Sequence, residues 1–113
     1  MLPPRIPKKP KRASRWRSQA HCTFVRGHAC SVCHSTAAIE VAHVRLGSGA
    51  GMGQKPDDFQ TVSLCRECHA EQHREGERTF WKNRPLNALL EAFQKASPKA
   101  QEIRQIQRER ANG

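Results

Sequence analysis

Two Cys-x-x-Cys pairs constrain this chain more than any other feature of its sequence. Cys30 and Cys33 form the first pair, Cys65 and Cys68 form the second, and 31 residues lie between Cys33 and Cys65. Each pair can place two thiolates at two corners of a tetrahedron, so two pairs complete a four-cysteine zinc site. A site of this kind is closed to substrates. We therefore predict one structural Zn²⁺ that takes no part in catalysis.

The size and composition of the chain favour such a metal. The chain has 113 residues, of which 36% are hydrophobic, with 4 Phe, 2 Trp and no Tyr. A hydrophobic core of that size stabilises a domain only weakly, whereas zinc can supply about 10 kcal/mol towards folding. We expect one small domain that unfolds without the metal. The fifth cysteine, Cys22, is predicted to be a small buried residue on a helix rather than a ligand.

The expected location is the cytoplasm of a bacterium or a phage-infected host. No apolar run reaches the about 18 residues that cross a bilayer. The basic N-terminus is not followed by the apolar segment of a secretory signal. In a reducing compartment, five cysteines indicate metal binding or catalysis rather than disulfides. No membrane partner is predicted.

The charge of the chain indicates a polyanionic partner, most simply DNA. The formal net charge is +10, and seven of the 20 Lys and Arg residues lie in the first 20 positions, where no acidic residue occurs. A basic arm on a nearly balanced body is typical of nucleic-acid binding. A solvated tail that aids solubility is the alternative. The arm residues predicted to contact DNA are Lys8, Lys9, Lys11 and Arg12.

Periodicity and turn residues predict an α+β order of elements. Residues 1–14 are predicted to be a disordered arm, because they contain four prolines and five charges. A short helix is expected within 15–27, with Trp16, Ala20 and Phe24 on one side. The segments that follow are a strand at 38–46, a glycine-rich loop at 47–56, a strand at 59–64, a helix at 66–74 that ends near Gly76, and helices at 86–93 and 98–110.

Three histidines lie on these predicted elements. His69 and His73 are four residues apart, so they share one face of the helix that follows the second cysteine pair. Two such imidazoles can clamp a divalent metal, although two surface histidines on a polar helix are the alternative. His43 lies in the middle of the first predicted strand. Phe80 and Trp81, which follow the helix, are predicted to be core residues rather than a platform for bases.

The motifs, taken in this order, resemble the HNH endonucleases of the ββα-metal superfamily. The matching segments are CSVC, EVAHVRLGSGAGMGQKPDDF, LCRECHAEQH and GERTFW, over roughly residues 21–82. The likeness is greatest to small phage-type members with a four-cysteine zinc, and the phage recombination-enhancement nucleases look like relatives. The resemblance implies a ββα-metal domain at 15–83, a helical extension at 84–113, and a possible recombination or packaging partner.

The resemblance also implies roles for individual residues. His43 falls on the general base, and His69 and His73 fall on the ligands of a single catalytic metal. Asp58, with Asp57 as second choice, replaces the middle Asn of the family. The family often has a further metal ligand just before the general base, where this chain has Ala42. The missing ligand is then Asp57, Asp58, a water or a DNA phosphate.

The function predicted is metal-dependent hydrolysis of DNA phosphodiester bonds by an endonuclease or nickase. Mg²⁺ or Mn²⁺ is expected, while two imidazoles would also accept Ni²⁺ or Zn²⁺. Arg45 and Lys55 flank the glycine-rich loop and are predicted phosphate contacts. The alternatives are a non-catalytic zinc-dependent DNA-binding accessory protein and a zinc scaffold for protein interactions. Oligomeric state and DNA preference are not predicted.

Overall fold

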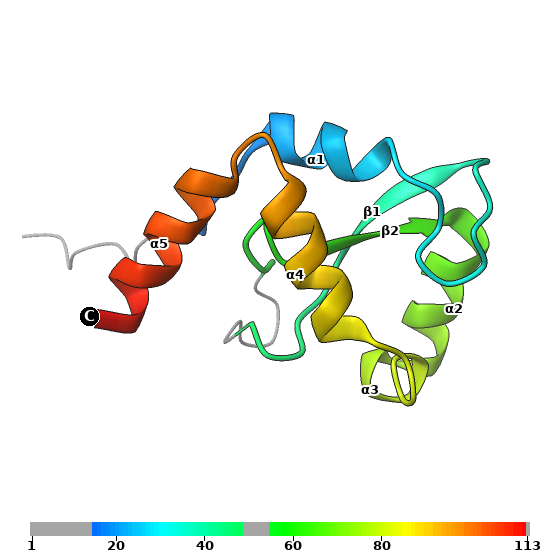
Figure 1. Ribbon diagram of the computed structural model, residues 1–113. Helices are drawn as coiled ribbons and strands as arrows, with labels where there is room; N and C mark the ends of the chain where they lie inside the picture. The colour runs from blue at the N-terminus through cyan, green and yellow to red at the C-terminus, as the bar shows by residue number, and fades with distance from the viewer. Residues whose placement is uncertain (1–14, 49–54, 113) are drawn as a thin grey trace, which may run out of the picture.

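The computed structural model describes residues 15–48 and 55–112. Over these ranges the chain forms a small α+β fold of two strands and five helices (Figure 1). The elements in chain order are α1 (Gln19–Arg26), β1 (Ile39–His43), β2 (Thr61–Cys65), α2 (Arg66–Glu75), α3 (Glu77–Phe80), α4 (Leu86–Ala96) and α5 (Ala100–Asn112). None of the helices in these two ranges is both long enough and apolar enough to cross a membrane.

The two strands form an antiparallel pair, and the chain passes from β2 directly into α2. The register places Ile39 opposite Cys65 and His43 opposite Thr61. Gly76 ends α2 with φ at 87°, a conformation that strains other residues. The predicted order of strand, loop, strand and helix is confirmed.

The first strand is shorter than predicted, because it ends at His43 rather than at residue 46. The backbone N–H groups of Arg45 and Leu46 do not continue the ladder. Both donate to Glu77 Oε1, at 2.7 and 3.1 Å. A side chain at the start of α3 thus takes the backbone donors that a longer strand would have used.

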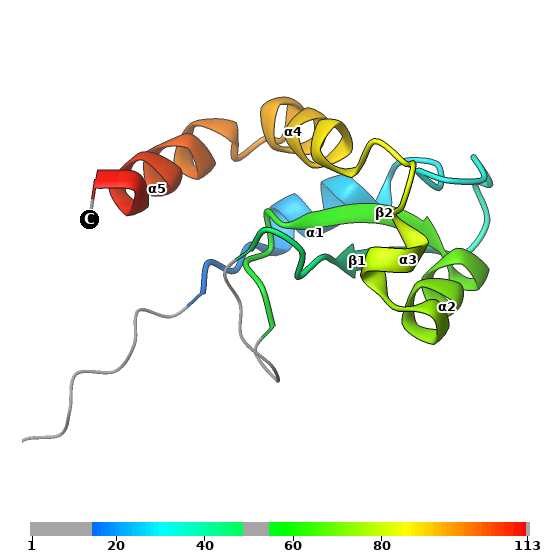
Figure 2. The same cartoon turned by 90° about the horizontal axis from the view of Figure 1, so that it is seen from below.

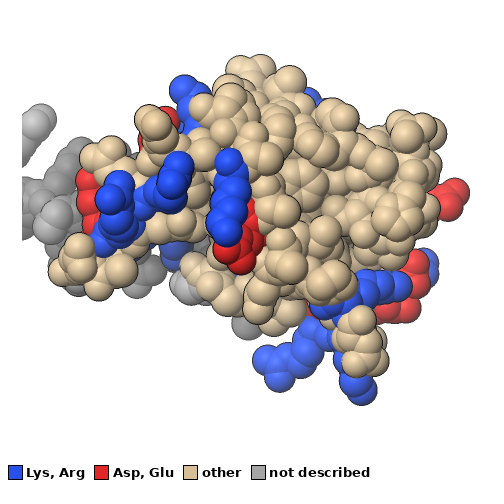
Figure 3. All heavy atoms as spheres, viewed as in Figure 1, with Lys and Arg blue, Asp and Glu red and all other residues tan. Residues whose placement is uncertain are grey.

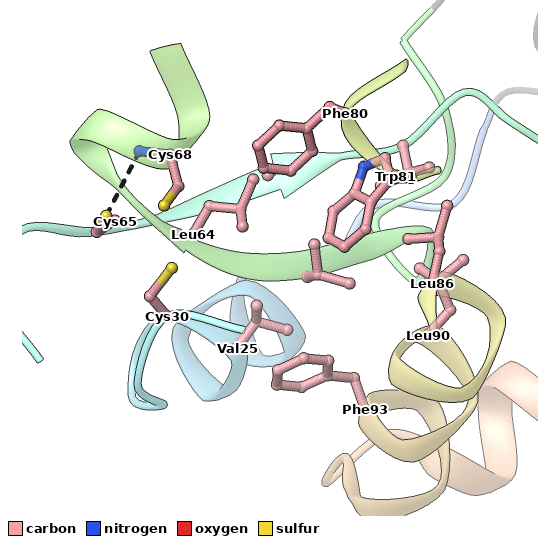
Figure 4. Close-up of a cluster of buried hydrophobic side chains, with 13 residues drawn as sticks. Val25, Cys30, Leu64, Cys65, Cys68, Phe80, Trp81, Leu86, Leu90 and Phe93 are labelled. Carbon is pink, nitrogen blue, oxygen red and sulfur yellow. Dashed lines mark hydrogen bonds between the residues drawn. The ribbon is translucent and has the colours of Figure 1, made fainter. Parts of the chain in front are cut away.

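The core packs on both sides of β2. Figure 4 shows Leu64 between Val25 of α1 and Phe80 of α3. The side chains of Phe80 and Trp81 are 1% and 4% exposed, so the prediction that they are core residues is confirmed. Helix α4 contributes its own apolar stripe to the same cluster, formed by Leu86, Leu90 and Phe93.

The buried face of α1 differs from the predicted one. The helix begins at Gln19 because Ser18 caps it, with its Oγ accepting from the backbone N–H of His21 at 3.2 Å. Trp16 therefore lies outside the helix and Ala20 is exposed, whereas His21 and Val25 are the buried residues. Cys22 is on the helix as predicted, but it is only partly buried.

Helix α5 lies at the opposite end of the molecule from α2 and α3 (Figure 2). Its Arg110 donates to both oxygens of Asp57, at 2.6 and 2.9 Å. Its Glu102 accepts from Trp16 Nε1 at 3.0 Å. These contacts join the C-terminal helix to the segments on either side of the site described next.

Candidate metal centre and histidine pocket

Four cysteine sulfurs converge where the first cysteine pair meets the end of β2. All four Sγ atoms lie within 4.8 Å of one another, and those of Cys33 and Cys65 are 3.6 Å apart. A tetrahedral zinc site with bonds of about 2.3 Å separates its sulfurs by about 3.8 Å. Within the described ranges, no other cluster of His, Cys, Asp and Glu offers converging donors of this kind. The four cysteines could therefore hold a structural metal ion such as zinc.

Backbone N–H groups point at the first sulfur of each pair. Cys33 N lies 3.5 Å from Cys30 Sγ, and Cys68 N lies 3.4 Å from Cys65 Sγ. Burial alone would raise the pKa of Cys30, but the N–H groups of Cys33, Cys65 and Val32 lower that pKa to about 6. Burial and the neighbouring thiols raise the pKa of Cys68. A thiolate is the form that binds a metal, so a ligating ion would stabilise charge on all four sulfurs.

Hydrogen bonds fix the first cysteine pair against β2. Ser31 N donates to Ser63 O at 2.8 Å, and Ser63 Oγ donates to Ala29 O at 2.7 Å. Ser63 is fully buried. The second pair spans the junction of β2 and α2, because Cys65 ends the strand and Cys68 lies in the first turn of the helix. The sulfur cluster thus holds α2 against the hairpin.

An open pocket of about 460 Å³ lies between β1 and α2. It brings together all three histidines predicted from the sequence, His43 from β1 and His69 and His73 from α2. Arg45 and Lys55, the predicted phosphate contacts, also line it. The remaining lining residues are Val41, Pro56, Gln72, Gly76 and Glu77.

His43 is paired with Asp58 at the edge of this pocket. His43 Nε2 lies 2.9 Å from Asp58 Oδ1. Burial alone would raise the pKa of Asp58, but hydrogen bonds from His43 and from the Ser18 N–H, together with the charge of Arg17, lower it. The ionised carboxylate can only accept, so Nε2 carries the proton and Nδ1 keeps a free lone pair.

The environment of His43 favours the neutral imidazole. Burial lowers the pKa of His43, and the positive charges of Lys55 and Arg17 lower it further. The hydrogen bond and the negative charge of Asp58 act in the opposite direction, and the net shift is downward from the ordinary value of 6.5. A neutral histidine that is oriented by a carboxylate is suited to accept a proton.

The structure separates the roles of the two adjacent aspartates. Both oxygens of Asp57 are occupied, because Oδ1 accepts from Trp16 N at 2.6 Å and the Arg110 guanidinium binds both. Asp57 is 1% exposed and does not line the histidine pocket. Asp58, in contrast, contacts His43. This arrangement favours Asp58 for the middle position and assigns Asp57 to an ion pair that joins three segments.

His69 and His73 lie side by side on α2. Their ring centroids are 4.8 Å apart, with 35° between the planes. His69 Nδ1 lies 2.8 Å from Glu40 Oε1 on β1. A carboxylate on Nδ1 leaves Nε2 as the unprotonated nitrogen, the usual arrangement of a histidine that binds a metal. Two imidazoles fit two positions in the shell of a divalent ion, and water or a substrate oxygen would have to fill the others.

Some predicted contacts lie outside the described residues. These are the arm residues Lys8, Lys9, Lys11 and Arg12, and the loop glycines Gly49, Gly51 and Gly53.

Sequence reasoning missed the residues that hold the predicted ones in place. Arg17 and the backbone N–H of Ser18 contact Asp58, at 3.5 and 2.8 Å, and Glu40 contacts His69. Ser18 is a residue type that favours helix N-caps, so the start of α1 could have been found. The contact of Glu40 spans 29 residues and has no sequence signal.

The comparison with protein families assigns the chain to a family of unknown function. The family model described as "Protein of unknown function (DUF968)" matches residues 3–97, and the chain belongs to this family. The match runs from the basic arm to the end of α4 and stops before α5. No curated protein and no solved structure matches the chain.

Proposed function

We propose that this protein is a metal-dependent endonuclease or nickase of the HNH type, acting on DNA phosphodiester bonds. The observation that carries the proposal is the pocket in which His43, held by Asp58, faces the two histidines of α2. An antiparallel hairpin followed directly by a helix is the frame on which such a site is built in the ββα-metal superfamily. Neither the pairing of His43 nor that of His69 is needed for a purely structural zinc domain.

His43 would act as the general base. Its Nε2 donates to the Asp58 carboxylate, so the Nδ1 lone pair is free to take a proton from a water molecule. A lowered pKa keeps this imidazole neutral at pH 7. The activated water would attack phosphorus, and one P–O bond of the DNA strand would break. Arg45 and Lys55, which line the same pocket, would hold the flanking phosphates.

His69 and His73 would hold the catalytic metal. Mg²⁺ or Mn²⁺, or else Ni²⁺ or Zn²⁺, bound there would stabilise the charge that develops on the scissile phosphate and its leaving oxygen. Glu40 would fix the ring orientation and tautomer of His69. Because Asp57 and Asp58 are engaged elsewhere, the remaining positions of that shell would be filled by water and by phosphate oxygens.

The second candidate is a zinc-dependent DNA-binding accessory protein without catalysis. The basic composition and the four-cysteine cluster fit both candidates. The engaged carboxylates of Asp58 and Glu40 favour the enzyme, since a binding module has no need to orient two histidines into a pocket.

Plasmid nicking separates the two candidates. Purified protein is incubated with supercoiled plasmid and Mg²⁺, Mn²⁺ or Ni²⁺, beside His43→Ala and the matched control His28→Ala. His28 is exposed and lies outside the pocket. We expect nicking by wild type and by His28→Ala, and a loss of about 100-fold or more in His43→Ala. Equal activity in all three, or none with any metal, contradicts the proposal.

A further inference from the structure

A second hollow, of about 880 Å³, lies next to the histidine pocket. It is lined by the end of the β1 loop, by α3 and by the start of α4. Its residues are Leu46, Gly47, Arg78, Thr79, Trp81, Lys82, Arg84, Pro85, Leu86, Asn87 and Ala88. We call this hollow the α3–α4 groove.

The α3–α4 groove and the histidine pocket share a wall. Arg45 and Glu77 line the pocket, and their chain neighbours Leu46 and Arg78 line the groove. The Glu77 carboxylate accepts from the backbone N–H groups of Arg45 and Leu46, which closes the wall between them. Trp81 in the groove donates to Gln72 in the pocket at 2.8 Å. A polymer that leaves the pocket over this wall therefore enters the groove.

The rim of the groove is basic. Arg78, Lys82 and Arg84 contribute to its lining, and no Asp or Glu does. All three side chains are exposed, and Lys and Arg side chains project from the end of the molecule that carries α3 (Figure 3). Arg84 is held in place, because its guanidinium lies 4.5 Å from the centre of the Phe80 ring and donates to Phe80 O. Exposed cations around a hollow without carboxylates are complementary to a phosphate backbone.

The floor of the groove is apolar. Leu46, Trp81 and Leu86 contribute apolar surface, and the one polar atom of the indole is already used by Gln72. An apolar floor adds little to the binding of a duplex, whose bases are stacked inside and whose surface is phosphate and sugar. The unpaired bases of a single strand present apolar faces that such a floor can cover.

We infer that the α3–α4 groove binds a single-stranded segment of nucleic acid next to the scissile phosphate. The bases lie on the floor and the phosphates contact Arg78, Lys82 and Arg84. This inference rests on the proposed nuclease function, because the pocket is taken as the place where the same strand is cut. It makes the preferred substrate a DNA with an unpaired stretch, such as a flap, a gap or a branch.

Binding without cleavage tests the groove. The fluorescence anisotropy of a labelled oligothymidine and of a labelled hairpin duplex is measured against full-length protein, without added divalent cations. Ala88→Glu introduces a carboxylate into the groove, and Ala92→Glu is its matched control. Both alanines are exposed on α4, and Ala92 does not line the groove. We expect Ala88→Glu to weaken oligothymidine binding about tenfold and Ala92→Glu to change it little.

A pair of charge variants tests the rim. Arg78→Gln with Lys82→Gln removes two groove cations, and Arg104→Gln with Arg108→Gln removes two exposed cations from α5. For single strands each lost phosphate contact lowers the salt slope by about 0.7, so the groove pair should lower it by about 1.4 and the α5 pair should not. Tighter binding of duplex than of oligothymidine, or equal losses in variant and control, overturns the inference.

The test separates the groove from the proposed enzyme. Groove-dependent binding by a protein that nicks no plasmid would leave the groove standing and remove the nuclease. Nicking of plasmid by a protein whose groove variants bind oligothymidine as wild type does would keep the nuclease and remove the groove.

Discussion

His43 Nε2 lies 2.9 Å from Asp58 Oδ1, and the two residues are 15 positions apart in the chain. The other oxygen of the same carboxylate accepts from the backbone N–H of Ser18 at 2.8 Å. Asp58 is 6% exposed, so its orientation is fixed by these contacts rather than by water. The tautomer of His43 is therefore set by a carboxylate that is itself held in place by the segment before α1.

Asp58→Asn should abolish most of the cleavage activity without unfolding the protein. An amide can donate to His43 Nε2, which moves the imidazole proton to Nδ1 and removes the lone pair that accepts a proton from water. We expect a loss of about 10² to 10⁴-fold in the nicking rate, which is the usual contribution of a general base. Zinc content and circular dichroism should match wild type.

The adjacent residue gives the control for this prediction. Asp57 contacts Arg110 and Trp16 rather than His43. Asp57→Asn should lower the melting temperature yet leave the nicking rate per folded molecule close to that of wild type. The reverse pattern, with Asp57→Asn inactive and Asp58→Asn active, would exchange the two assignments.

The activity should fall at low pH with an apparent pKa below 6.5. His43 must be neutral to accept a proton, and burial, Lys55 and Arg17 lower its pKa from the ordinary value of 6.5. The rate should therefore hold as pH decreases to 6.5 and fall only below that value. Arg17→Gln removes one of the cations, so it should raise the pKa of His43 and move the acid limb upward. A wild-type limb above 6.5 would be inconsistent with His43 as the base.

Removal of one zinc ligand should unfold the domain rather than slow it. Cys65 contributes a sulfur and also ends β2 and caps α2. We expect Cys65→Ser to lose zinc by elemental analysis and to become sensitive to protease at 25 °C, because such sites contribute about 10 kcal/mol to folding. Cys22→Ser is the matched control, since Cys22 lies outside the four-cysteine cluster. A folded, zinc-loaded Cys65→Ser protein would show that the ligand set is wrong.

Glu40 should tune the affinity of the α2 histidines for a divalent metal. Its Oε1 lies 2.8 Å from His69 Nδ1. Loss of a carboxylate that supports a metal-binding histidine typically weakens metal binding about 10- to 100-fold. Glu40→Ala should show this loss by isothermal titration calorimetry with Mn²⁺ or Ni²⁺, and Glu40→Gln, which keeps an acceptor, should lose less. Equal affinities in wild type and Glu40→Ala would remove Glu40 from the site.

The order of elements and the local motifs were predictable because they depend on short-range patterns. The cysteine pairs, the strand residues around His43 and the i, i+4 spacing of His69 and His73 all act within one element or at one junction. Their convergence on one pocket followed from the order of strand, loop, strand and helix alone. The burial of Phe80 and Trp81 followed from their size and apolar character.

The supporting contacts were not predictable, because they join segments far apart in the chain. Asp57 pairs with Arg110 across 53 residues, and Glu40 pairs with His69 across 29. Either aspartate could have filled the middle position on sequence alone, since both have the same chemistry and adjacent places. The choice depends on the direction in which each carboxylate points, which tertiary packing decides. The early end of β1 likewise depends on Glu77, a residue of a later helix.

Arg110→Ala should destabilise the protein at neutral pH without changing its chemistry. The Arg110 guanidinium binds both oxygens of Asp57, whose side chain is 1% exposed. Because the Arg110 side chain is 41% exposed, we expect a loss of about 1 to 2 kcal/mol in the free energy of unfolding by urea, with Arg108→Ala as the matched control. Burial alone would raise the pKa of Asp57, but the contacts with Arg110 and Trp16 lower it below 3.8 in the folded protein. The pair therefore stabilises the fold above pH 3.8, and its contribution is lost as the pH falls through the lowered pKa. The difference between wild type and Arg110→Ala should accordingly narrow in acid, and a difference that stays constant down to pH 2 would show that Arg110 acts through packing rather than through the Asp57 charge.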